Sequence, residues 1–378
     1  MSLIGIDARF YGEAGPGRYT KNIVTHLEQV DKKNHYIVFL TKKNFELYTP
    51  KNTNFVKVLA DYGWYTFAEQ TLFLLKLLKY RLDLLYVPHF NIPIFYPGRL
   101  VTAIADVIMH EFSTEEGTTL PKPYYRLKKR IYYLVVLMAL LRSKKVIVPT
   151  ITTKNEIAKY YPRIRKDKFV LAYEALDPDL TLECANSVEV LSKYGIRKPY
   201  ILYISSMYEH KNVKRLVEAF ELLVNNSQFD GELVLVGKKD KYSQEIYDLV
   251  SKKGLRDKVL LPGMNERVDD QSTVCLRKEA ALYVFPSLKE GFSLTPLESM
   301  VHSIPCVISK IPCHEEVYGD SAVYFDPLDV NDIAQKMHIG LTDQKLREDL
   351  ISRGRVLLGK YSFTETAKIT SQVFKDVL

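Results

Sequence analysis

Residues 281–298 read ALYVFPSLKEGFSLTPLE. The short apolar run Ala281–Phe285 is typical of a buried strand, and Thr295–Val301 has the pattern of a helix. A polar loop with a single glycine joins the two. Because a buried strand that passes through a short loop into a helix is the repeating unit of parallel α/β sheets, this stretch predicts that fold class.

The same alternation extends through the second half of the chain. The apolar runs predict strands at Tyr200–Ile204, Glu232–Val236, Lys258–Leu261 and Cys306–Ile308. Amphipathic stretches between them predict helices at Asn212–Asn225, Ser243–Lys253 and Gln271–Glu279. Strands separated by helices form a doubly wound sheet, with helices on both faces.

The first half of the chain repeats this organisation. Strands are predicted at Leu3–Ile6, Tyr36–Leu40, Val56–Leu59, Leu84–Val87, Leu100–Ala105 and Lys145–Pro149. Helices are predicted at Gly17–Val30, Thr66–Tyr80 and Tyr124–Leu141. The sequence therefore predicts two doubly wound units in tandem.

The division between the units falls in a stretch with weak periodicity, Asp177–Lys198, which contains Pro178 and Gly195 and is followed by Pro199. We interpret this stretch as a linker. The predicted domains are residues 1–177 and residues 178–360, and 378 residues suffice for both. The last stretch, residues 361–378, has a helical pattern and is predicted to cross back onto the first domain.

The composition indicates which kinds of molecule the protein is expected to bind. The chain is 26% charged and carries a net charge of +8, which favours an anionic partner such as a nucleotide, a membrane surface or a nucleic acid. No nucleic-acid-binding module is visible. The N-terminus lacks the features of a signal peptide, and the longest apolar run, Leu134–Leu141, is too short to span a bilayer.

The four cysteines show no disulfide or zinc spacing. They are Cys184, Cys275, Cys306 and Cys313. We therefore expect a reducing, cytoplasmic compartment and no metal.

The loop after the strand at 281–285 carries the strongest chemical signal. Gly291 is expected to allow a tight turn, and the residues after it present backbone N–H groups at a helix start, which suits an anion. Glu290 and Glu298 flank this loop and can accept hydrogen bonds from sugar or ribose hydroxyls. The alternative is an ordinary strand–helix turn with solvated glutamates.

Two further loops follow predicted strands. Lys211, with His210 beside it, follows the strand at 200–204, where a cation can stabilise a departing diphosphate. Gly15 and Gly17 follow the first strand, where glycines permit a phosphate or sugar to approach the backbone. A solvated lysine and a flexible turn are the alternatives. The glycine spacing does not match a nicotinamide dinucleotide site.

Together these motifs resemble family 4 of the glycosyltransferases, a large family of retaining enzymes with the GT-B fold. Glu290 and Glu298 match the E-x7-E motif, and residues 286–309 resemble the surrounding block closely. Residues 4–20, His210-Lys211-Asn212 and the segment from Phe325 to Pro327 resemble other family segments. The likeness extends over nearly the whole chain, and it implies a GT-B fold whose two Rossmann-like domains face each other across a cleft.

The resemblance also implies roles. Glu298 would bind the donor ribose, Glu290 the hydroxyls of the transferred sugar, and Lys211 the diphosphate. Catalytic residues would be Glu290, Lys211 and Asp106. The donor-binding set would comprise Gly15, Gly17, Ser206, His210, Lys211, Glu290, Gly291, Phe292, Ser293, Leu294 and Glu298. The implied reaction retains the anomeric configuration, with no cofactor and no essential metal.

Two positions depart from the family pattern. Ser205-Ser206 stands where the family often has glycine-arginine, and the missing arginine usually shares the diphosphate with the lysine. His210, if protonated, or Arg215 could compensate. Ala105-Asp106 stands where the family often has histidine-aspartate. This change suggests a different sugar, help from His110 or His89, or impaired catalysis.

The segment from Lys122 to Lys145 combines a basic, tyrosine-rich start with a short apolar run. This pattern suits the surface of an anionic membrane, at the inner face of the cell membrane. A core helix with a solvated basic start is the alternative.

We therefore expect a retaining hexosyltransferase. It would move a sugar from a nucleotide diphosphate donor to a glycan or lipid-linked acceptor, in the assembly of surface polysaccharide or glycolipid. Two alternatives stay open. One is a non-catalytic relative that binds glycan or nucleotide, and the other is a GT-B enzyme of another kind, such as a sugar-nucleotide 2-epimerase.

Overall fold

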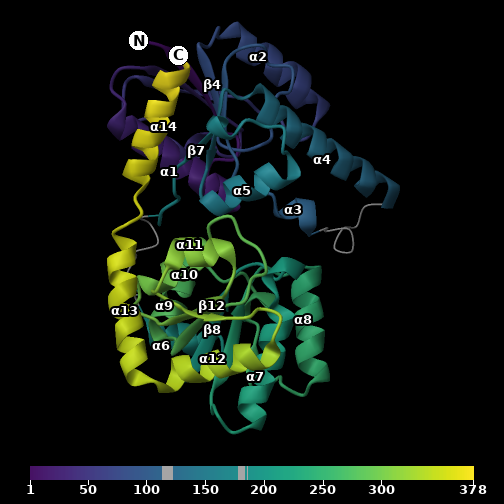
Figure 1. The fold of residues 1–378 in the computed structure, drawn as a ribbon, viewed down its shortest axis with the longest axis vertical. Helices are drawn as coiled ribbons and strands as arrows, with labels where there is room; N and C mark the ends of the chain where they lie inside the picture. The colour runs from purple at the N-terminus through teal and green to yellow at the C-terminus, as the bar shows by residue number, and fades with distance from the viewer. Residues whose placement is uncertain (113–121, 178–183, 185) are drawn as a thin grey trace. The chain divides into compact units, whose positions relative to one another are not determined.

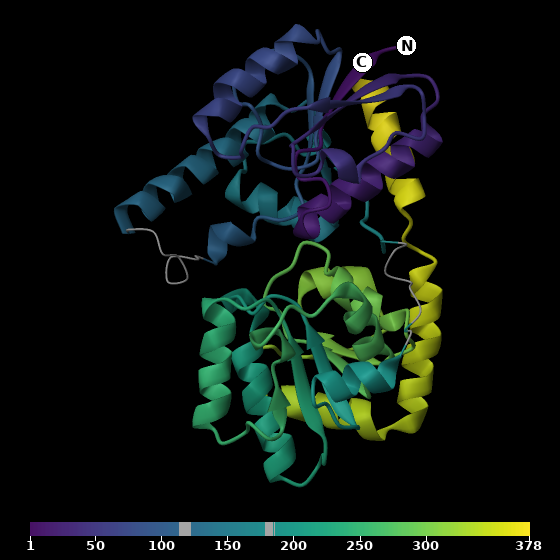
Figure 2. The same cartoon turned by 180° about the vertical axis from the view of Figure 1, so that it is seen from behind.

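The computed structural model describes residues 1–112, 122–177, 184 and 186–378. The chain forms two compact units, of which the first comprises Met1–Ala175 with Ser362–Leu378 and the second Leu176–Tyr361. These bounds lie within two residues of the domain limits that the sequence predicts. Each unit is a sheet with helices on both faces (Figure 1 and Figure 2).

The sheet of the first unit has seven strands in the order β3-β2-β1-β4-β5-β6-β7, and all of its strand pairs are parallel. The strands are β1 (Leu3–Asp7), β2 (His35–Leu40), β3 (Phe55–Leu59), β4 (Leu84–Val87), β5 (Leu100–Ala103), β6 (Lys145–Val148) and β7 (Phe169–Leu171). The helices are α1 (Ala14–Val30), the π-helical turn η2 (Glu69–Phe73), α2 (Leu74–Lys79), α3 (Ile108–Glu111), α4 (Lys122–Arg142) and α5 (Ile151–Tyr160).

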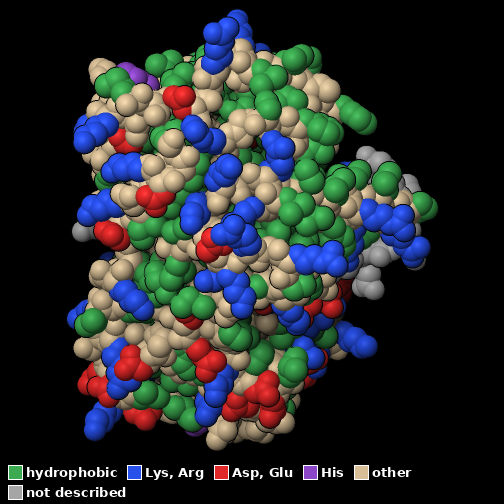
Figure 3. Space-filling view, turned by 45° about the horizontal axis from the view of Figure 1, so that its top comes forward, with side chains coloured by type: hydrophobic (Ala, Val, Ile, Leu, Met, Phe, Trp, Pro, Cys, Tyr) green, Lys and Arg blue, Asp and Glu red, His purple; other side chains and the backbone are tan. Residues whose placement is uncertain are grey.

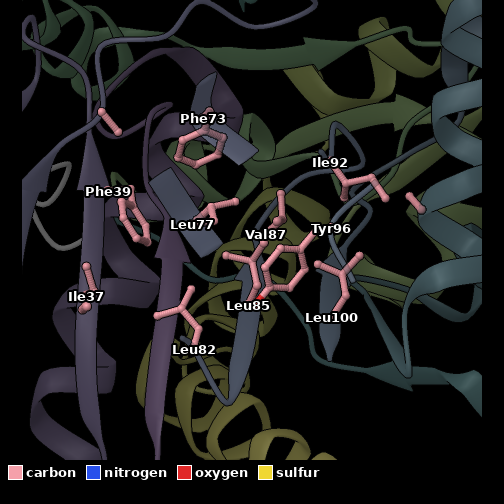
Figure 4. Close-up of a cluster of buried hydrophobic side chains, with 12 residues drawn as sticks. Ile37, Phe39, Phe73, Leu77, Leu82, Leu85, Val87, Ile92, Tyr96 and Leu100 are labelled. Atoms are coloured by element: carbon pink, nitrogen blue, oxygen red, sulfur yellow. The ribbon is translucent and has the colours of Figure 1, made fainter. Parts of the chain in front are cut away.

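The core on one face of this sheet lies beneath η2 and α2. Side chains alternate between the two faces of a strand, so Leu85 and Val87 of β4 point the same way. They pack with Phe73 and Leu77 in one buried cluster, which Figure 4 shows in close-up. This apolar layer fixes the strand ends from which the site loops leave.

The other face of the first sheet is covered by the end of the chain. Helix α14 (Phe363–Val377) packs against α1, as both ribbon views show. Its Phe374 meets the ring of Tyr86, with ring centroids 5.1 Å apart. The hydroxyl of Thr366 donates to the carbonyl of Tyr173 at 2.6 Å. The prediction that the terminal helix returns to the first domain is thus confirmed.

The second unit has a six-stranded parallel sheet in the order β10-β9-β8-β11-β12-β13. The strands are β8 (Tyr200–Ile204), β9 (Glu232–Val236), β10 (Val259–Leu260), β11 (Leu282–Phe285), β12 (Cys306–Ser309) and β13 (Val323–Phe325). The helices are α6 (Ser187–Lys193), α7 (Val213–Asn225), α8 (Lys241–Lys252), α9 (Asp270–Glu279), α10 (Leu294–Met300), α11 (Pro312–Tyr318), α12 (Val330–Thr342) and α13 (Gln344–Leu358).

The order of this sheet reverses between β8 and β11. From β8 the chain winds outward through β9 and β10, and it then returns so that β11 pairs with the other side of β8. Ligands of open parallel sheets bind outside the carboxyl ends of the strands at such a reversal. The loops after β8 and β11 are therefore the ones to examine.

The interpretation of Asp177–Lys198 as a linker without regular structure is wrong for its second part. Residues Ser187–Lys193 form helix α6, which the side chain of Asn186 caps by accepting from the backbone N–H of Glu189. Short polar helices of this kind carry little periodicity, so the sequence pattern missed it. Residues 178–183 and 185 of the predicted linker lie outside the described residues.

The expectation that no cysteines are paired is also wrong. Cys184 and Cys275 form a disulfide that ties the segment before α6 to helix α9. The two cysteines are 91 positions apart in the chain, so their spacing does not indicate that they form a disulfide. Cys306 and Cys313 are free thiols and are buried. A reducing compartment consequently has no support from the cysteines.

Candidate functional site

The two strongest sequence motifs lie next to each other, because they follow the neighbouring strands β8 and β11. Lys211 ends the short turn η5 (Glu209–Lys211) after β8, and Glu290 lies in the loop after β11. The Lys211 ammonium lies 2.5 Å from Oε1 of Glu290, with side-chain exposures of 12% and 8%. A backbone hydrogen bond of 2.7 Å from the N–H of Leu288 to the carbonyl of His210 also links the two loops.

The charge of Glu290 is maintained by its neighbours. Burial would raise the pKa of Glu290, but the Lys211 charge, the nearby His210 and hydrogen bonds from Lys211 and Ser287 outweigh it, so the pKa is lowered. Glu290 is therefore an anion at neutral pH. The alternative interpretation of this motif, a turn with solvated glutamates, is contradicted because Glu290 and Glu298 are both buried.

Asn212, next to Lys211, ties the loops together more firmly. Its side-chain amide donates to the carbonyls of Pro286, at 3.1 Å, and Pro327, at 2.7 Å. Its φ of 59° is left-handed, a conformation that asparagine tolerates better than most residues. The side-chain oxygen accepts from Arg215 at 2.8 Å, so Arg215 is held here as a support of Asn212. The sequence motif contains Asn212, but only the structure reveals this role.

His210 does not supply the second positive charge that the sequence allows for. Burial lowers its pKa to about 4, and the neighbouring Lys211 ammonium lowers it as well. The imidazole is thus neutral at pH 7. Ser206, at the position where the family often has arginine, lies in the same loop, and its carbonyl accepts from the hydroxyl of Tyr203 at 2.5 Å.

The chain bends at Gly291, as expected, and the left-handed residue of this loop is Ser293. Ser293 has a left-handed φ of 70° immediately before α10, and Gly291 is not among the residues with positive φ. The Ser293 hydroxyl lies 2.9 Å from Nε2 of His314, and its carbonyl accepts from the Tyr318 hydroxyl. These bonds fix the predicted donor loop, which includes Phe292 and Leu294.

His314 supports this loop as a neutral residue. Its Nδ1 lies 2.8 Å from the carbonyl of Ser309. Since a carbonyl can only accept, Nδ1 carries the proton and Nε2 accepts from Ser293. Burial lowers the pKa of His314 to about 4. No local sequence pattern predicts this supporting role of His314, because its partners lie on other elements.

Glu298 forms the second buried ion pair of the unit. It lies in α10, and its Oε2 is 2.5 Å from Nη2 of Arg277 on α9, with both side chains at 6% exposure or less. The sequence pattern predicted Glu298 as a site residue and missed Arg277. A charged residue on a surface helix usually faces solvent, so its identity alone gave no signal.

The glycines predicted in the first unit lie in a helix. Gly15 and Gly17 belong to the first turn of α1, which begins three residues earlier than predicted. A Cβ at Gly17 would lie 2.2 Å from the carbonyl oxygen of Phe10, so this position requires glycine for backbone packing. Gly15 has open space around it. Only Gly15 therefore leaves room for a ligand at the backbone.

The three remaining candidates of the first unit follow strands of its sheet. Asp106 follows β5 and accepts from the backbone N–H of Ile108 at 3.0 Å. His89 follows β4, stacks near Phe10 and Phe90, and has a pKa that burial lowers to about 4. Both ring nitrogens of His110 contact tyrosine hydroxyls, so these interactions give His110 a supporting role.

Among the described residues, no group of three or more histidine, cysteine, aspartate or glutamate side chains is arranged to hold a metal ion. No helix in the described part of the chain is long and apolar enough to cross a membrane.

The second unit matches a known protein family. Residues 191–357 match the family model described as Glycosyl transferases group 1. The chain is 27% identical over 288 residues to O-antigen chain mannosyltransferase B of Escherichia coli, covering 75% of this chain and 73% of that protein. It is 25% identical over 236 residues to O-antigen chain mannosyltransferase RfbU of Salmonella typhimurium, covering 62% of this chain and 61% of RfbU.

Other comparisons cover smaller shares or show the fold alone. Serotype-specific mannosyltransferase WbdA of Escherichia coli is 31% identical over 188 residues, but the chain spans only 23% of its length. Anabaena HepE, solved with UDP and glucose, superposes with a TM-score of 0.73 at 14% identity, over 100% of this chain and 99% of HepE. WaaG, a glycosyltransferase involved in lipopolysaccharide biosynthesis, gives 0.71 at 18% identity, over 98% of this chain and 99% of WaaG.

Proposed function

Because residues 191–357 of this GT-B protein are a Glycosyl transferases group 1 domain, we propose that the chain is a retaining hexosyltransferase. It would use a nucleotide-sugar donor and a glycan or lipid-linked acceptor in the assembly of a cell-surface polysaccharide. The observation that carries the proposal is the buried Lys211–Glu290 pair at the carboxyl ends of adjoining strands.

The pair supplies the two interactions that sugar transfer requires. Glu290, held as an anion, accepts hydrogen bonds from the hydroxyls of the transferred sugar. Lys211 offers N–H donors to the diphosphate, whose negative charge grows as the sugar–phosphate bond breaks. A fixed cation in a water-poor site stabilises that charge more strongly than water does. Glu298 would accept from the donor ribose.

Retention fits the group 1 domain, whose family is generally retaining. His314 is bonded on both ring nitrogens, which does not suit a base that takes the proton of the acceptor. In a front-face reaction the departing phosphate oxygen itself takes the proton of the acceptor hydroxyl. We therefore propose this route, in which Lys211 acts on the leaving group and Asp106 belongs to the acceptor side.

The names of the relatives favour mannose as the transferred sugar. O-antigen chain mannosyltransferase B and RfbU both carry that sugar in their names. The nucleotide is an open part of the proposal, since HepE was solved with UDP and with UDP-glucose.

We also propose that α4 rests on an anionic membrane, where a lipid-linked acceptor would be found. One side of α4 is buried in the core with Tyr132, Val136 and Leu140. The opposite side carries four exposed apolar residues, each with 45% to 53% of its surface accessible to solvent: Leu127, Ile131, Leu134 and Leu141. Basic residues flank these side chains in the sequence. Figure 3 shows hydrophobic and basic side chains mixed on this part of the first unit, a combination that suits an anionic membrane surface.

The proposal is tested with the purified protein and a panel of diphosphates: UDP, GDP, ADP and dTDP, with CMP beside them. A nucleotide that binds the folded state raises the melting temperature. The matching nucleotide sugar should then release nucleoside diphosphate only when an acceptor extract is added. Binding without turnover would favour a non-catalytic protein, and conversion of the nucleotide sugar without acceptor would favour an epimerase.

A further inference from the structure

Arg277 and Glu298 form a charged pair that is withdrawn from water. Arg277 is 3% exposed and Glu298 is 5% exposed. The guanidinium Nη2 lies 2.5 Å from Oε2 of Glu298. Removing two charges from water costs several kcal/mol per ion, and mutual attraction does not always offset this cost. A buried pair of this kind is therefore weak support for a purely stabilising role.

The guanidinium is also incompletely satisfied. Its Nε–H is buried and has no hydrogen-bond partner in the described part of the chain. A buried donor without a partner destabilises the fold. Two apolar residues of similar size would avoid both costs, so the fold tolerates this arrangement at some expense of stability. The arrangement thus points to a role for Glu298 that needs Arg277.

The backbone just before Arg277 is anchored at two consecutive residues. The carbonyl of Leu276 accepts from the buried hydroxyl of Tyr200 on β8, at 2.7 Å. Cys275 is joined to Cys184 by the disulfide. The backbone position of Arg277 in α9 is therefore fixed, and this fixes the direction from which its guanidinium approaches Glu298.

We infer that Arg277 is a positioning residue, which holds the Glu298 carboxylate in the orientation that accepts hydrogen bonds from the 2′ and 3′ hydroxyls of the donor ribose. This inference rests on the proposed function, in which Glu298 binds the ribose. A carboxylate has about four lone-pair sites, so it can accept from more than one donor at a time. Arg277 itself would not touch the donor.

The test compares two ligands on the full chain: the nucleoside diphosphate that binds best, and its 2′,3′-dideoxy analogue. Calorimetry gives the dissociation constants for wild type, Arg277→Gln, Arg277→Lys and Glu298→Gln. Losing a hydrogen bond to a charged group corresponds to about tenfold or more in affinity. We expect Arg277→Gln to weaken the parent nucleotide about tenfold and the dideoxy analogue less than twofold.

Arg347 provides the matched control. It is a partly buried arginine of the same unit, and its Nη1 donates to the carbonyls of Ala281 and Gly340. Arg347→Gln should lower the melting temperature. It should leave unchanged the ratio of the dissociation constant of the dideoxy analogue to that of the parent nucleotide. If Arg277→Gln does not fold, Arg277→Lys keeps the charge without the planar fork, and it should also reduce the ratio.

The outcomes separate the inference from the proposed function. If the wild type binds no nucleotide, or Glu298→Gln leaves the ratio unchanged, the proposed ribose contact fails, and the inference fails with it. If Glu298→Gln reduces the ratio and neither Arg277 variant does so, the inference alone is overturned. Equal weakening of both ligands by the Arg277 variants would assign Arg277 a general structural role and would also overturn it.

Discussion

Nζ of Lys211 lies 2.5 Å from Oε1 of Glu290, although 79 residues separate the two in the chain. The pair exists because β8 and β11 are neighbours in the sheet, so the loops that follow them leave the same edge side by side. Lys211 also lies 5.1 Å from the centroid of the Phe285 ring, which limits where the ammonium can move. Under the proposed function, the residue that contacts the sugar and the residue that contacts the diphosphate are therefore adjacent before a donor binds.

Replacing Glu290 by glutamine should lower the transfer rate by at least a hundredfold and change nucleoside diphosphate affinity by less than fivefold. The amide keeps the shape of the side chain but loses the charge that strengthens its bonds to sugar hydroxyls. Initial rates and calorimetry check the two values. Glu221→Gln, at a partly exposed pair with Lys253, should leave both unchanged. A Glu290→Gln enzyme with the wild-type rate would remove Glu290 from the mechanism.

Replacing Lys211 by alanine should lower turnover by about a hundred- to a thousandfold, because the charge on the departing diphosphate is no longer compensated. Single-turnover rates at saturating donor measure this effect. Lys214→Ala is the control, since the Lys214 ammonium pairs with Glu245 in an exposed position on α7. A Lys211→Ala rate within threefold of wild type would contradict the assignment.

Acid should destabilise the fold through His314 before it affects Glu290. Burial lowers the pKa of His314 to about 4 in the folded state, below its ordinary value of 6.5. The unfolded chain therefore binds an extra proton between these values, and the contribution of His314 to stability, present above pH 6.5, is lost as the pH falls toward 4. From pH 6.5 to pH 5 this loss is about 1.5 kcal/mol.

Denaturant unfolding of wild type and His314→Asn at the two pH values checks this prediction. The groups that bear on His314 are Glu290, Lys211 and the Ser309 backbone. The pKa of Glu290 is lowered from its ordinary value, so Glu290 stays charged in this range. The drop in unfolding free energy should be about 1.5 kcal/mol smaller in the variant. An equal drop in both proteins would show that His314 is accessible to protons in the folded state.

Changing Leu127 and Ile131 together to glutamate should weaken binding to vesicles of anionic lipid by tenfold or more. The two side chains would no longer enter the interface, and two negative charges would face the lipid. Cosedimentation with phosphatidylglycerol vesicles measures the effect. Val356→Glu, at a 78% exposed position on α13, is the control. Unchanged binding of the double variant would place the membrane contact elsewhere or exclude it.

The sequence predicted most of the fold because long apolar runs and amphipathic helices are local patterns. It missed β7 and β13, which have three residues each and leave too short a pattern to recognise. It also made no prediction for α5, α11, α12 and α13, and it missed α6 and the disulfide between Cys184 and Cys275.

Of the candidate site, the sequence predicted single residues and left their contacts open. Lys211 and Glu290 were both candidates, but their contact depends on strand order, which no local pattern encodes. The residue with left-handed backbone in this loop is Ser293, which donates to His314 and accepts from Tyr318, and no local pattern predicts a serine in that conformation. Arg277 was invisible, because only the tertiary structure buries that position.

Helix α14 makes the first unit of the chain the last to be finished. A ribosome makes Met1–Ala175 first, yet Phe374 of α14 packs on Tyr86 only when Phe363–Val377 emerges. At ordinary rates of synthesis the intervening chain takes on the order of ten to forty seconds to appear. For that time the nascent first unit presents a bare apolar surface, so chaperones or early contact with a membrane would matter most before translation ends.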